Sequence, residues 1–462
     1  MRTTRSTFIR ARWIGFSEDD AKPIAEGGRY SGNTVIRLIY NLLWPLGLLV
    51  FLPGYLRKML RRGGYREKFG QRLGIYDIGL RARLANHRAT WLHAVSVGEV
   101  GIALKLARQL RALQPDLPCV LTTTTTTGFA LANQTAPPWM EVIYNPLDFW
   151  PVMRRAFAVM RPARIVLIEA EVWPNLVAEA HARRIPVILA NARLSPQSEQ
   201  RFRRFRLLVA PTFRLLDLVC VVEPEDVDRW AALGVDRARI ERTGSVKYDA
   251  ADVVVDPTGP VAVLRALNID NRRPILLGGS THPGEEEILA QVFRQLRAEF
   301  VDLFLVLAPR HAERAREVER TLSQLGLRVA LRSHSDTVND NFDCLLLDTT
   351  GELRNWYAIA TVVFIGKSLL AHGGQNPAEV ILAGKPVVFG PHMENFSVFA
   401  QWLLERSGAV QVHSANELHQ VTIDLLRDAK ARERLVANAQ NVLATHNGAT
   451  ARTAKLILSE QK

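Results

Sequence analysis

The chain has 462 residues, of which 48% are hydrophobic and 23% charged, and its formal net charge is +13. This composition excludes a disordered protein, and the length favours two domains of about 150–200 residues each over a single core. The three cysteines lie far apart in apolar runs, which predicts buried thiols in a reducing compartment and excludes a disulfide framework. The eleven histidines form no H-x-x-x-H pattern, so we expect no metal site.

The positive charge requires an anionic partner or surface. No nucleic-acid-binding motif is present, and the basic residues do not alternate with aromatic ones along a stripe, so we expect no nucleic acid. An anionic membrane surface or a phosphorylated substrate fits the charge better.

The N-terminal part of the chain predicts membrane attachment. Residues 1–33 are polar and expected to be disordered, and residues 34–62 contain the uncharged 19-residue run Leu38–Leu56. Basic residues follow this run, as expected for a cytoplasmic flank or for a contact with anionic lipids. The run either spans the bilayer or lies in its interface, and a core helix of the first domain is the alternative that we favour less.

A strand-to-helix turn follows at His93-Ala94-Val95-Ser96-Val97-Gly98-Glu99. Thr90–Val95 is short and apolar, as in a buried strand, and Val100–Leu113 has helical spacing. Glu99 therefore lies near a helix N-terminus. It either stabilises its own helix or acts as a general base at the carboxyl end of a parallel strand.

Strands alternate with helices over residues 63–250, which predicts an α/β domain with a doubly wound parallel sheet. A linker is expected at 251–262, where the periodicity is lost, and a second α/β domain at 263–462. The expected strands are Thr90–Val95, Cys119–Thr124, Val142–Tyr144, Arg164–Ile168, Pro186–Ala190, Leu218–Val222 and Arg239–Thr243, then Pro274–Gly278, Leu303–Ala308, Cys344–Leu347, Thr361–Ile365, Pro386–Phe389 and Ala409–Val412. A polar helix over Ala429–Leu458 is expected to end the chain.

Charged residues of the first domain gather where strands end. Glu169 and Glu171 follow one strand, and Lys247 follows another just before the linker. The two glutamates act in catalysis or are solvated acids at a helix entry, and we favour catalysis. Lys247 either contacts developing negative charge or lies at the surface, and the sequence does not decide between the two.

Four loops of the second domain follow strands and are rich in glycine, hydroxyl and charged residues: Gly278–Glu286, Ala308–His311, Asp348–Leu353 and Gly366–Glu379. None of them is a G-x-G-x-x-G motif or a P-loop. Together they predict a nucleotide site, because helix N-termini and arginine bind phosphate.

In order, these pieces resemble the 3-deoxy-D-manno-octulosonic acid (Kdo) transferases of lipopolysaccharide synthesis, from about Leu38 to the C-terminus. The motifs that carry the resemblance are HAVSVGE, PDLP-x-x-x-TT, IEAEVWPN, ANARLS, TGSVKYD, GGSTHPGEE, APRH, TTGEL, GGQNPAE and GPHMENF. The family implies a GT-B fold with two Rossmann-like domains and an N-terminal membrane-anchoring helix. It also implies an enzyme at the cytoplasmic face of the inner membrane, with CMP-Kdo as donor, a tetra-acylated lipid A precursor (lipid IVA) as acceptor and no cofactor.

The resemblance also assigns roles to residues. Glu99 matches the general base, whereas Glu169 and Lys247 match positions that stabilise the transition state. The donor site is expected to comprise Ser280, His282, Pro309, Arg310, His311, Gly351, Glu352, Leu353, Asn376, Pro377, Ala378 and Glu379. Two departures from the family pattern, Gly366-Lys367 for two glycines and Ala378 for leucine, put donor affinity in question rather than activity.

Together, these observations predict direct displacement at the anomeric carbon with inversion. Arg193, Arg201, Arg203, Arg204 and Arg206 either bind the acceptor phosphates or form a solvated or lipid-facing patch. Two rival functions are a GT-B transferase that uses a UDP-sugar and a membrane-bound nucleotide-binding protein without turnover.

Overall fold

The computed structural model describes residues 36–44, 47, 68–85, 88–194, 196–249, 255–270, 272–334 and 341–460. The chain divides into two compact units, Met1–Arg61 and Arg62–Lys462. In the first unit, residues 36–44 are helical, and the rest of the predicted segment Leu38–Leu56 lies almost entirely outside the described residues. Within the described part of the chain, no helix combines the length and the apolar character needed to cross a membrane.

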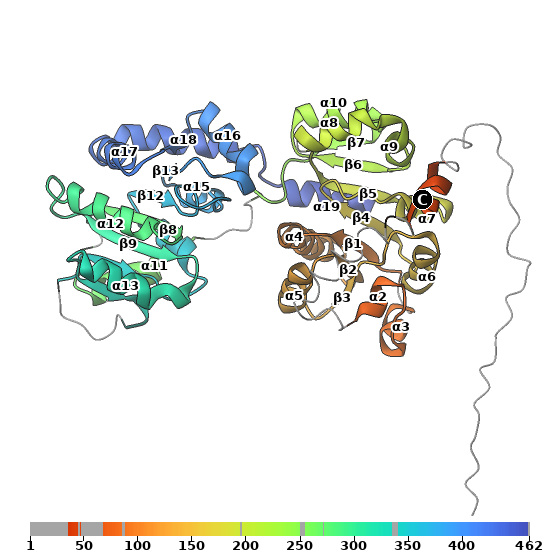
Figure 1. The fold of residues 1–462 in the computed structure, drawn as a ribbon, viewed down its shortest axis with the longest axis horizontal. Coiled ribbons are helices and arrows are strands. Elements are labelled where there is room, and N and C mark those ends of the chain that lie inside the picture. The colour runs from red at the N-terminus through yellow and green to blue at the C-terminus, as the bar shows by residue number, and fades with distance from the viewer. Residues whose placement is uncertain are drawn as a thin grey trace, which may run out of the picture. The chain divides into compact units, whose positions relative to one another are not determined.

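The second unit begins with a sheet of seven parallel strands in the order β3-β2-β1-β4-β5-β6-β7. Helices alternate with these strands along the chain (Figure 1). The strands are β1 (Thr90–Ala94), β2 (Cys119–Thr123), β3 (Met140–Tyr144), β4 (Arg164–Ile168), β5 (Val187–Ala192), β6 (Leu218–Val221) and β7 (Ile240–Arg242). The helices are α2 (Phe69–Arg72), α3 (Ile78–Ala85), α4 (Val97–Leu113), α5 (Thr126–Thr135), α6 (Trp150–Met160), α7 (Pro174–Ala182), α8 (Pro196–Arg204), α9 (Arg206–Phe213) and α10 (Pro224–Ala232).

Two hydrophobic cores cover the two faces of this sheet. Successive strand residues alternate between them: Trp91 packs in one core and Leu92 in the other. Side chains alternate across a strand, so a strand covered on both faces is apolar at most of its positions. This explains why β1 to β6 read as nearly continuous apolar runs.

A second sheet of seven parallel strands has the order β10-β11-β9-β8-β12-β13-β14. Its strands are β8 (Ile275–Thr281), β9 (Phe304–Pro309), β10 (Val329–Leu331), β11 (Cys344–Leu346), β12 (Val362–Ile365), β13 (Val387–Phe389) and β14 (Val410–Gln411). Its helices are α11 (Thr258–Ala266), α12 (Glu285–Leu296), α13 (Ala315–Gln324), α14 (Leu353–Tyr357), α15 (Ala378–Leu382), α16 (Ser397–Glu405), α17 (Ala415–Arg427) and α18 (Ala429–Ala444). All thirteen predicted strands are present within a few residues, and the three-residue strand β10 is an addition. The three cysteines are buried, as predicted.

The C-terminal helix differs from its prediction. A single helix was expected over Ala429–Leu458, but the chain forms α18 and then α19 (Ala449–Ser459). Gly448 separates the two with a φ of 74°, a left-handed conformation that favours glycine. Helix α19 packs against α4, which covers the first sheet (Figure 1). Ala454 and Ile457 enter the core there, and the Arg164 guanidinium donates to the Ile457 carbonyl at 2.8 Å. The end of the chain therefore completes the layer that covers the first sheet.

Candidate active site

The order of the strands defines one switch point in each sheet, where successive connections leave in opposite directions. In the first sheet this point lies between β1 and β4, and in the second between β8 and β12. Open α/β sheets bind ligands at the carboxyl ends of the strands that flank such a point. Glu99 follows β1 and Glu169 follows β4, so the predicted catalytic carboxylates lie at the first switch point.

Glu99 is the third residue of α4 and is only 8% exposed. Ser96 is the N-cap, and its hydroxyl accepts from the Glu99 backbone N–H at 3.4 Å. The Glu99 carboxylate in turn accepts from the Val95 N–H at 2.8 Å and from the Ser96 hydroxyl at 2.7 Å. Glu99 therefore does stabilise the start of its own helix, and the same bonds fix the orientation of its carboxylate.

The surroundings of Glu99 also change the pKa of its carboxyl group. Burial raises the pKa of Glu99, and the negative charge of Glu169 raises it further, against the effect of the bonds from Val95 and Ser96. Burial, and then the charges of Glu99 and Glu169, raise the pKa of Glu171 to about 7. Three carboxylates thus interact at one edge of the sheet, and two of them, Glu99 and Glu171, hold a proton more strongly than ordinary glutamates do.

The backbone of Glu169 is unusual. Its φ is +61°, in the left-handed region that non-glycine residues rarely occupy. Its N–H donates to the Ala190 carbonyl at 3.0 Å, so β5 fixes the turn in which it lies. Such strained positions concentrate at functional sites.

Lys247 lies in the TGSVKYD segment after β7. Its ammonium donates to the Asn395 carbonyl at 3.3 Å and lies 4.3 Å from the centre of the Phe396 ring. Burial and then the charge of Arg193 lower the pKa of Lys247, whereas Glu169 acts in the opposite direction. Lys247 is therefore electrostatically coupled to the carboxylate site.

Asn191 of the ANARLS motif holds the segment that carries Lys247. Its Oδ1 accepts from the Val246 N–H at 2.9 Å and from the Ser245 hydroxyl at 3.4 Å. Its own φ is +54°, which asparagine tolerates better than most residues. Asn191 is not among the residues predicted to act at the site, although its place in the ANARLS motif at the carboxyl end of β5 was a usable signal.

Asp249 anchors the other end of the same segment. Its carboxylate accepts from the Gly448 N–H at 2.9 Å and from the Thr450 N–H at 2.7 Å, at the start of α19. The C-terminal helix thereby fixes the segment that carries Lys247.

The predicted donor residues follow four strands that are neighbours in the second sheet, in the order β11, β9, β8 and β12. The loops after β8 and β12 touch at Gly366, where a Cβ would lie 2.5 Å from the Ser280 carbonyl oxygen. By strand the residues are Ser280 near the end of β8 and His282 just after it; Pro309, Arg310 and His311 at the end of β9; Gly351, Glu352 and Leu353 at the start of α14; and Asn376, Pro377, Ala378 and Glu379 at the start of α15. The topology thus brings all four predicted loops to one edge.

Side-chain contacts link several of these residues. The rings of His282 and His311 lie 6.0 Å apart, edge to face. Asn376 Oδ1 accepts from the Ala378 N–H at 3.1 Å and opens α15. Glu379 pairs with Arg354 at 3.7 Å, and Glu352 pairs with Arg332 at 3.2 Å. Arg310 and His311 are exposed.

One loop differs from its expected role as a phosphate cradle. The carboxylate of Glu285, which is fully buried, accepts from the backbone N–H groups of His282, Lys367, Ser368 and Leu369 at 2.7–3.0 Å. These four donors are therefore used inside the protein. Three glutamates also occupy the first turn of α12, Glu285, Glu286 and Glu287, which is unfavourable for a phosphate at that helix end.

The departure at Lys367 has a conformational consequence. Lys367 has a φ of +57°, where glycine is favoured, and it stands where the resembling family often has glycine. Its N–H donates to Glu285, so the bond to the buried carboxylate holds the residue in this conformation.

The five arginines that are candidates for binding the acceptor phosphates do not form one group. Four of them are exposed on α8 and α9: Arg201, Arg203, Arg204 and Arg206. Arg193 instead interacts with Lys247 and Tyr248.

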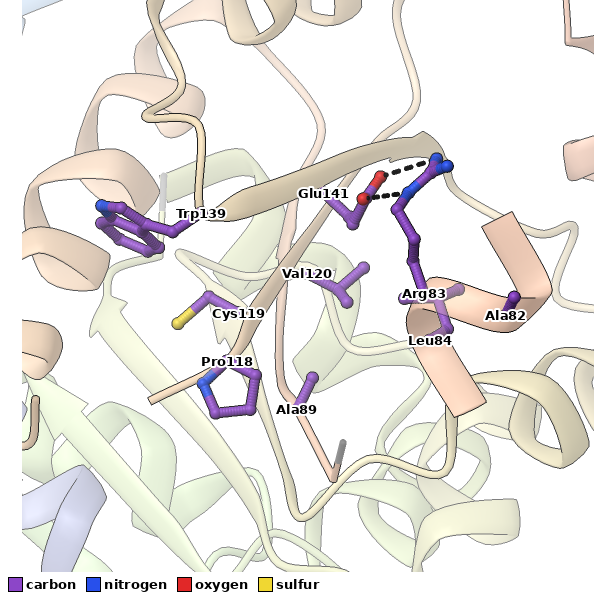
Figure 2. Close-up of a pocket in the computed structure, with 9 residues that line it drawn as sticks. All are labelled: Ala82, Arg83, Leu84, Ala89, Pro118, Cys119, Val120, Trp139 and Glu141. Carbon is purple, nitrogen blue, oxygen red and sulfur yellow. Dashed lines mark hydrogen bonds and ion pairs between the residues drawn. The ribbon is translucent and has the colours of Figure 1, made fainter. Parts of the chain in front are cut away.

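A cavity of about 540 Å³ opens at the amino ends of β1, β2 and β3. It is lined by Cys119, Trp139 and the ion pair of Arg83 with Glu141 (Figure 2). It lies at the opposite edge from Glu99, where α/β sheets do not place their active sites.

The sequence is similar to characterised families along most of its length. A family model described as 3-deoxy-D-manno-octulosonic-acid transferase (kdotransferase) matches residues 67–250. The 3-deoxy-D-manno-octulosonic acid transferase of Haemophilus influenzae is 33% identical over 394 residues, which are 85% of this chain and 91% of that protein. The chain belongs to the Kdo transferase family.

Other comparisons agree with this assignment. The 3-deoxy-D-manno-octulosonic acid transferase of Bordetella pertussis is also 33% identical, over 90% of this chain and 97% of its own length. A crystal structure of UDP-N-acetylglucosamine 2-epimerase, 16% identical, covers 81% of this chain and 98% of that one with a TM-score of 0.53. The latter shows a shared fold only. The predicted family is therefore confirmed, and with it the prediction of a glycosyltransferase. The predicted α/β fold with two parallel sheets is also confirmed, and it matches that of GT-B neighbours.

Proposed function

We propose that this member of the Kdo transferase family transfers Kdo from CMP-Kdo to a tetra-acylated lipid A precursor (lipid IVA) and releases CMP. The observation that carries the proposal is the position of Glu99. It is a nearly buried carboxylate at the β1–β4 switch point, coupled to Glu169 and, through Glu169, to Lys247. Family membership supplies the sugar that is transferred.

In the proposed reaction, a carboxylate oxygen of Glu99 takes the proton of the acceptor's primary hydroxyl group. The hydroxyl oxygen forms a bond to the anomeric carbon of Kdo as the bond from that carbon to the CMP phosphate oxygen breaks. A single displacement of this kind inverts the anomeric centre. The raised pKa of Glu99 favours the step, because the carboxylate retains the abstracted proton more strongly.

The charges that develop need partners. Lys247 is a cation beside the carboxylate site and is suited to stabilise negative charge in the transition state. Glu169 is suited to stabilise positive charge at the anomeric centre. The CMP is assigned to the edge of the second sheet, where Arg310 supplies a cation that can pair with a phosphate.

Backbone N–H groups of the loops after β8 and β12 are already bonded to Glu285, and this narrows the choice of residues that can bind the donor phosphate. Since Glu285 takes four backbone donors, we assign the donor phosphate to Arg310 and to the segment from Asn376 to Glu379. Ser280 and His282 then contribute side chains rather than a backbone cradle.

We further propose that the enzyme acts at the cytoplasmic face of the inner membrane, attached through the N-terminal segment 34–62. The basic residues after Leu56 and the exposed arginines of α8 and α9 support a contact with anionic lipid or with the acceptor phosphates.

A product assay tests the proposal. Full-length protein in detergent receives CMP-Kdo and a tetra-acylated lipid A precursor, and the lipid is analysed by mass spectrometry while released CMP is quantified. We expect the lipid to gain one or more Kdo masses with one CMP released for each. A matched reaction with a UDP-sugar tests the rival donor. An unchanged lipid, from protein that CMP protects against heat, would overturn the proposed acceptor or activity.

A further inference from the structure

The GPHMENF segment has no role in the proposed reaction, yet it brings two histidines and a glutamate together. Nδ1 of His372 lies 2.9 Å from Glu394 Oε1, and Nδ1 of His392 lies 3.3 Å from the same oxygen. The two imidazole rings are 4.0 Å apart between their centres. One ligand atom from each of the three residues lies within 4.8 Å of the other two.

We propose that His372, His392 and Glu394 form a binding site for a transition-metal ion of the zinc class. Two imidazoles and one carboxylate are a donor set that favours Zn²⁺, Co²⁺ or Ni²⁺ over Mg²⁺ or Ca²⁺. The inference concerns metal binding and does not rest on the proposed transferase reaction.

The spacing of the donor atoms fits such an ion. Tetrahedral Zn²⁺ with bonds of about 2.0–2.1 Å holds its ligand atoms about 3.3 Å apart. The two nitrogen–oxygen distances, 2.9 and 3.3 Å, are close to that edge length. Three protein ligands leave the fourth position to solvent or to another small ligand.

The backbone around the cluster holds the ligands in place. The second carboxylate oxygen of Glu394 accepts from the Gly373 N–H at 2.6 Å, which orients the group. The Asn395 N–H donates to the Gly373 carbonyl at 3.0 Å, and the His392 N–H donates to the Ser368 carbonyl at 2.9 Å. The two segments that supply the ligands are thus joined before any ion binds, which reduces the entropy lost on binding.

No metal site was expected from the sequence, because these ligands do not lie close together along the chain. His372 and His392 are twenty positions apart, in the loop after β12 and the loop after β13. The parallel pairing of β12 with β13 brings these loops together. An ion bound here would link two segments. One is the loop that leads from His372 to Asn376, and the other contains Asn395, whose carbonyl accepts from Lys247.

The exposure of the three residues sets the choice of variants. The side chain of His372 is 75% exposed, so His372→Ala removes a ligand with little risk to folding. His392→Ala and Glu394→Gln remove the other two. His413→Ala is the matched control, because His413 is an exposed histidine outside the cluster.

The test is a Co²⁺ titration of tag-free, chelator-treated full-length protein, followed by visible absorption and by competition with Zn²⁺. We expect wild type and His413→Ala to bind one Co²⁺ with the intense absorption of a tetrahedral site. Each cluster variant should bind at least about tenfold more weakly. Thermal unfolding in chelator should be the same for wild type, His372→Ala and His413→Ala.

Two results would overturn the proposal. One is a wild-type titration without a tetrahedral spectrum, which would mean that the hydrogen bonds between the histidines and Glu394 are the whole purpose of the cluster. The other is unchanged affinity in His372→Ala, which would place the bound metal on other histidines.

Discussion

Glu99 and Glu285 each follow the first strand of a seven-stranded parallel sheet, and each lies in the first turn of the next helix. Glu99 accepts from one N–H and one hydroxyl, whereas Glu285 accepts from four backbone N–H groups. A carboxylate has about four lone-pair positions. Glu285 is therefore saturated by the protein, and Glu99 retains acceptor capacity for a substrate proton.

This difference shows that the position of a carboxylate in an α/β sheet does not decide its role. The Glu285 carboxylate is saturated by backbone donors and joins two loops. The Glu99 carboxylate has fewer donors and lies near other carboxylates, so it is available to accept a proton. The predictions below test the two sides of this comparison.

The largest effect on stability is expected for Glu285→Ala. Four N–H groups lose their acceptor, and two of them, those of Ser368 and Leu369, are buried, so the free energy of unfolding should fall by about 3–5 kcal/mol. Urea denaturation followed by tryptophan fluorescence measures this change. Glu287→Ala, an exposed residue of the same helical turn, should change it by about 0.5 kcal/mol or less. Equal effects of the two substitutions would refute the structural role of Glu285.

Lys247→Ala tests the cation that is coupled to Glu169. If Lys247 stabilises the transition state, turnover should fall by about 10²–10³-fold while the protein remains folded. Lys385 is the matched control, because burial also lowers the pKa of this lysine but it precedes β13, at the amino edge of its sheet. Kinetics of lipid product formation measure both variants. A loss in Lys385→Ala equal to that in Lys247→Ala would mean that general destabilisation explains the result.

Asn191→Ala tests whether the segment that carries Lys247 must be held in place. The substitution removes the acceptor for the Val246 N–H and puts alanine at a positive φ, so turnover should fall about tenfold. Asn191→Asp keeps the acceptor oxygen and should retain most of the activity. Measuring kcat and KM separately distinguishes a positioning role from a loss of substrate binding, since a positioning residue affects kcat more than KM. Equal activity of the two variants would contradict the assignment.

A smaller effect is expected for Glu171, which should make the stability of the protein depend on pH. Glu171 has a pKa of about 7 in the folded protein against an ordinary 4.5, so the folded state binds more protons and loses stability as pH rises from 4.5 through 7. Glu171→Gln removes this loss. At pH 8.5 the variant should be more stable than wild type by about 1–2 kcal/mol, and at pH 5 nearly equal to it.

Thermal unfolding at both pH values measures this difference. Glu313→Gln, an exposed glutamate, serves as the control and should shift stability equally at both. A pH-independent difference between wild type and Glu171→Gln would show that Glu171 is charged throughout.

Much of the fold follows from the sequence, because strands buried on both faces are apolar at most positions. The short strand β10 was not predicted, since the three residues Val329–Leu331 cannot establish a pattern. The break between α18 and α19 depends on Gly448 and on the packing of α19 against α4, a contact between distant parts of the chain.

The site shows the same division. The motifs place Glu99, Glu169 and Lys247 at the ends of strands, and the order of the strands makes Glu99 and Glu169 neighbours. Lys247 follows the edge strand β7, and its segment is held by the contact of Val246 with Asn191 of β5. The saturation of Glu285 depends on donors about eighty residues away, and the cluster of His372, His392 and Glu394 depends on two loops meeting. Local sequence patterns do not contain such long-range contacts.

The most direct test of the account compares wild type with Glu99→Gln in the lipid product assay, with CMP affinity measured by calorimetry on the same samples. The amide keeps the shape of the side chain but is a very poor base. The account predicts that turnover falls by about 10²–10⁴-fold, that CMP affinity stays within about twofold, and that thermal unfolding is little changed. Near-normal turnover in Glu99→Gln, from protein that binds CMP as wild type does, would contradict the assignment of Glu99 as the general base.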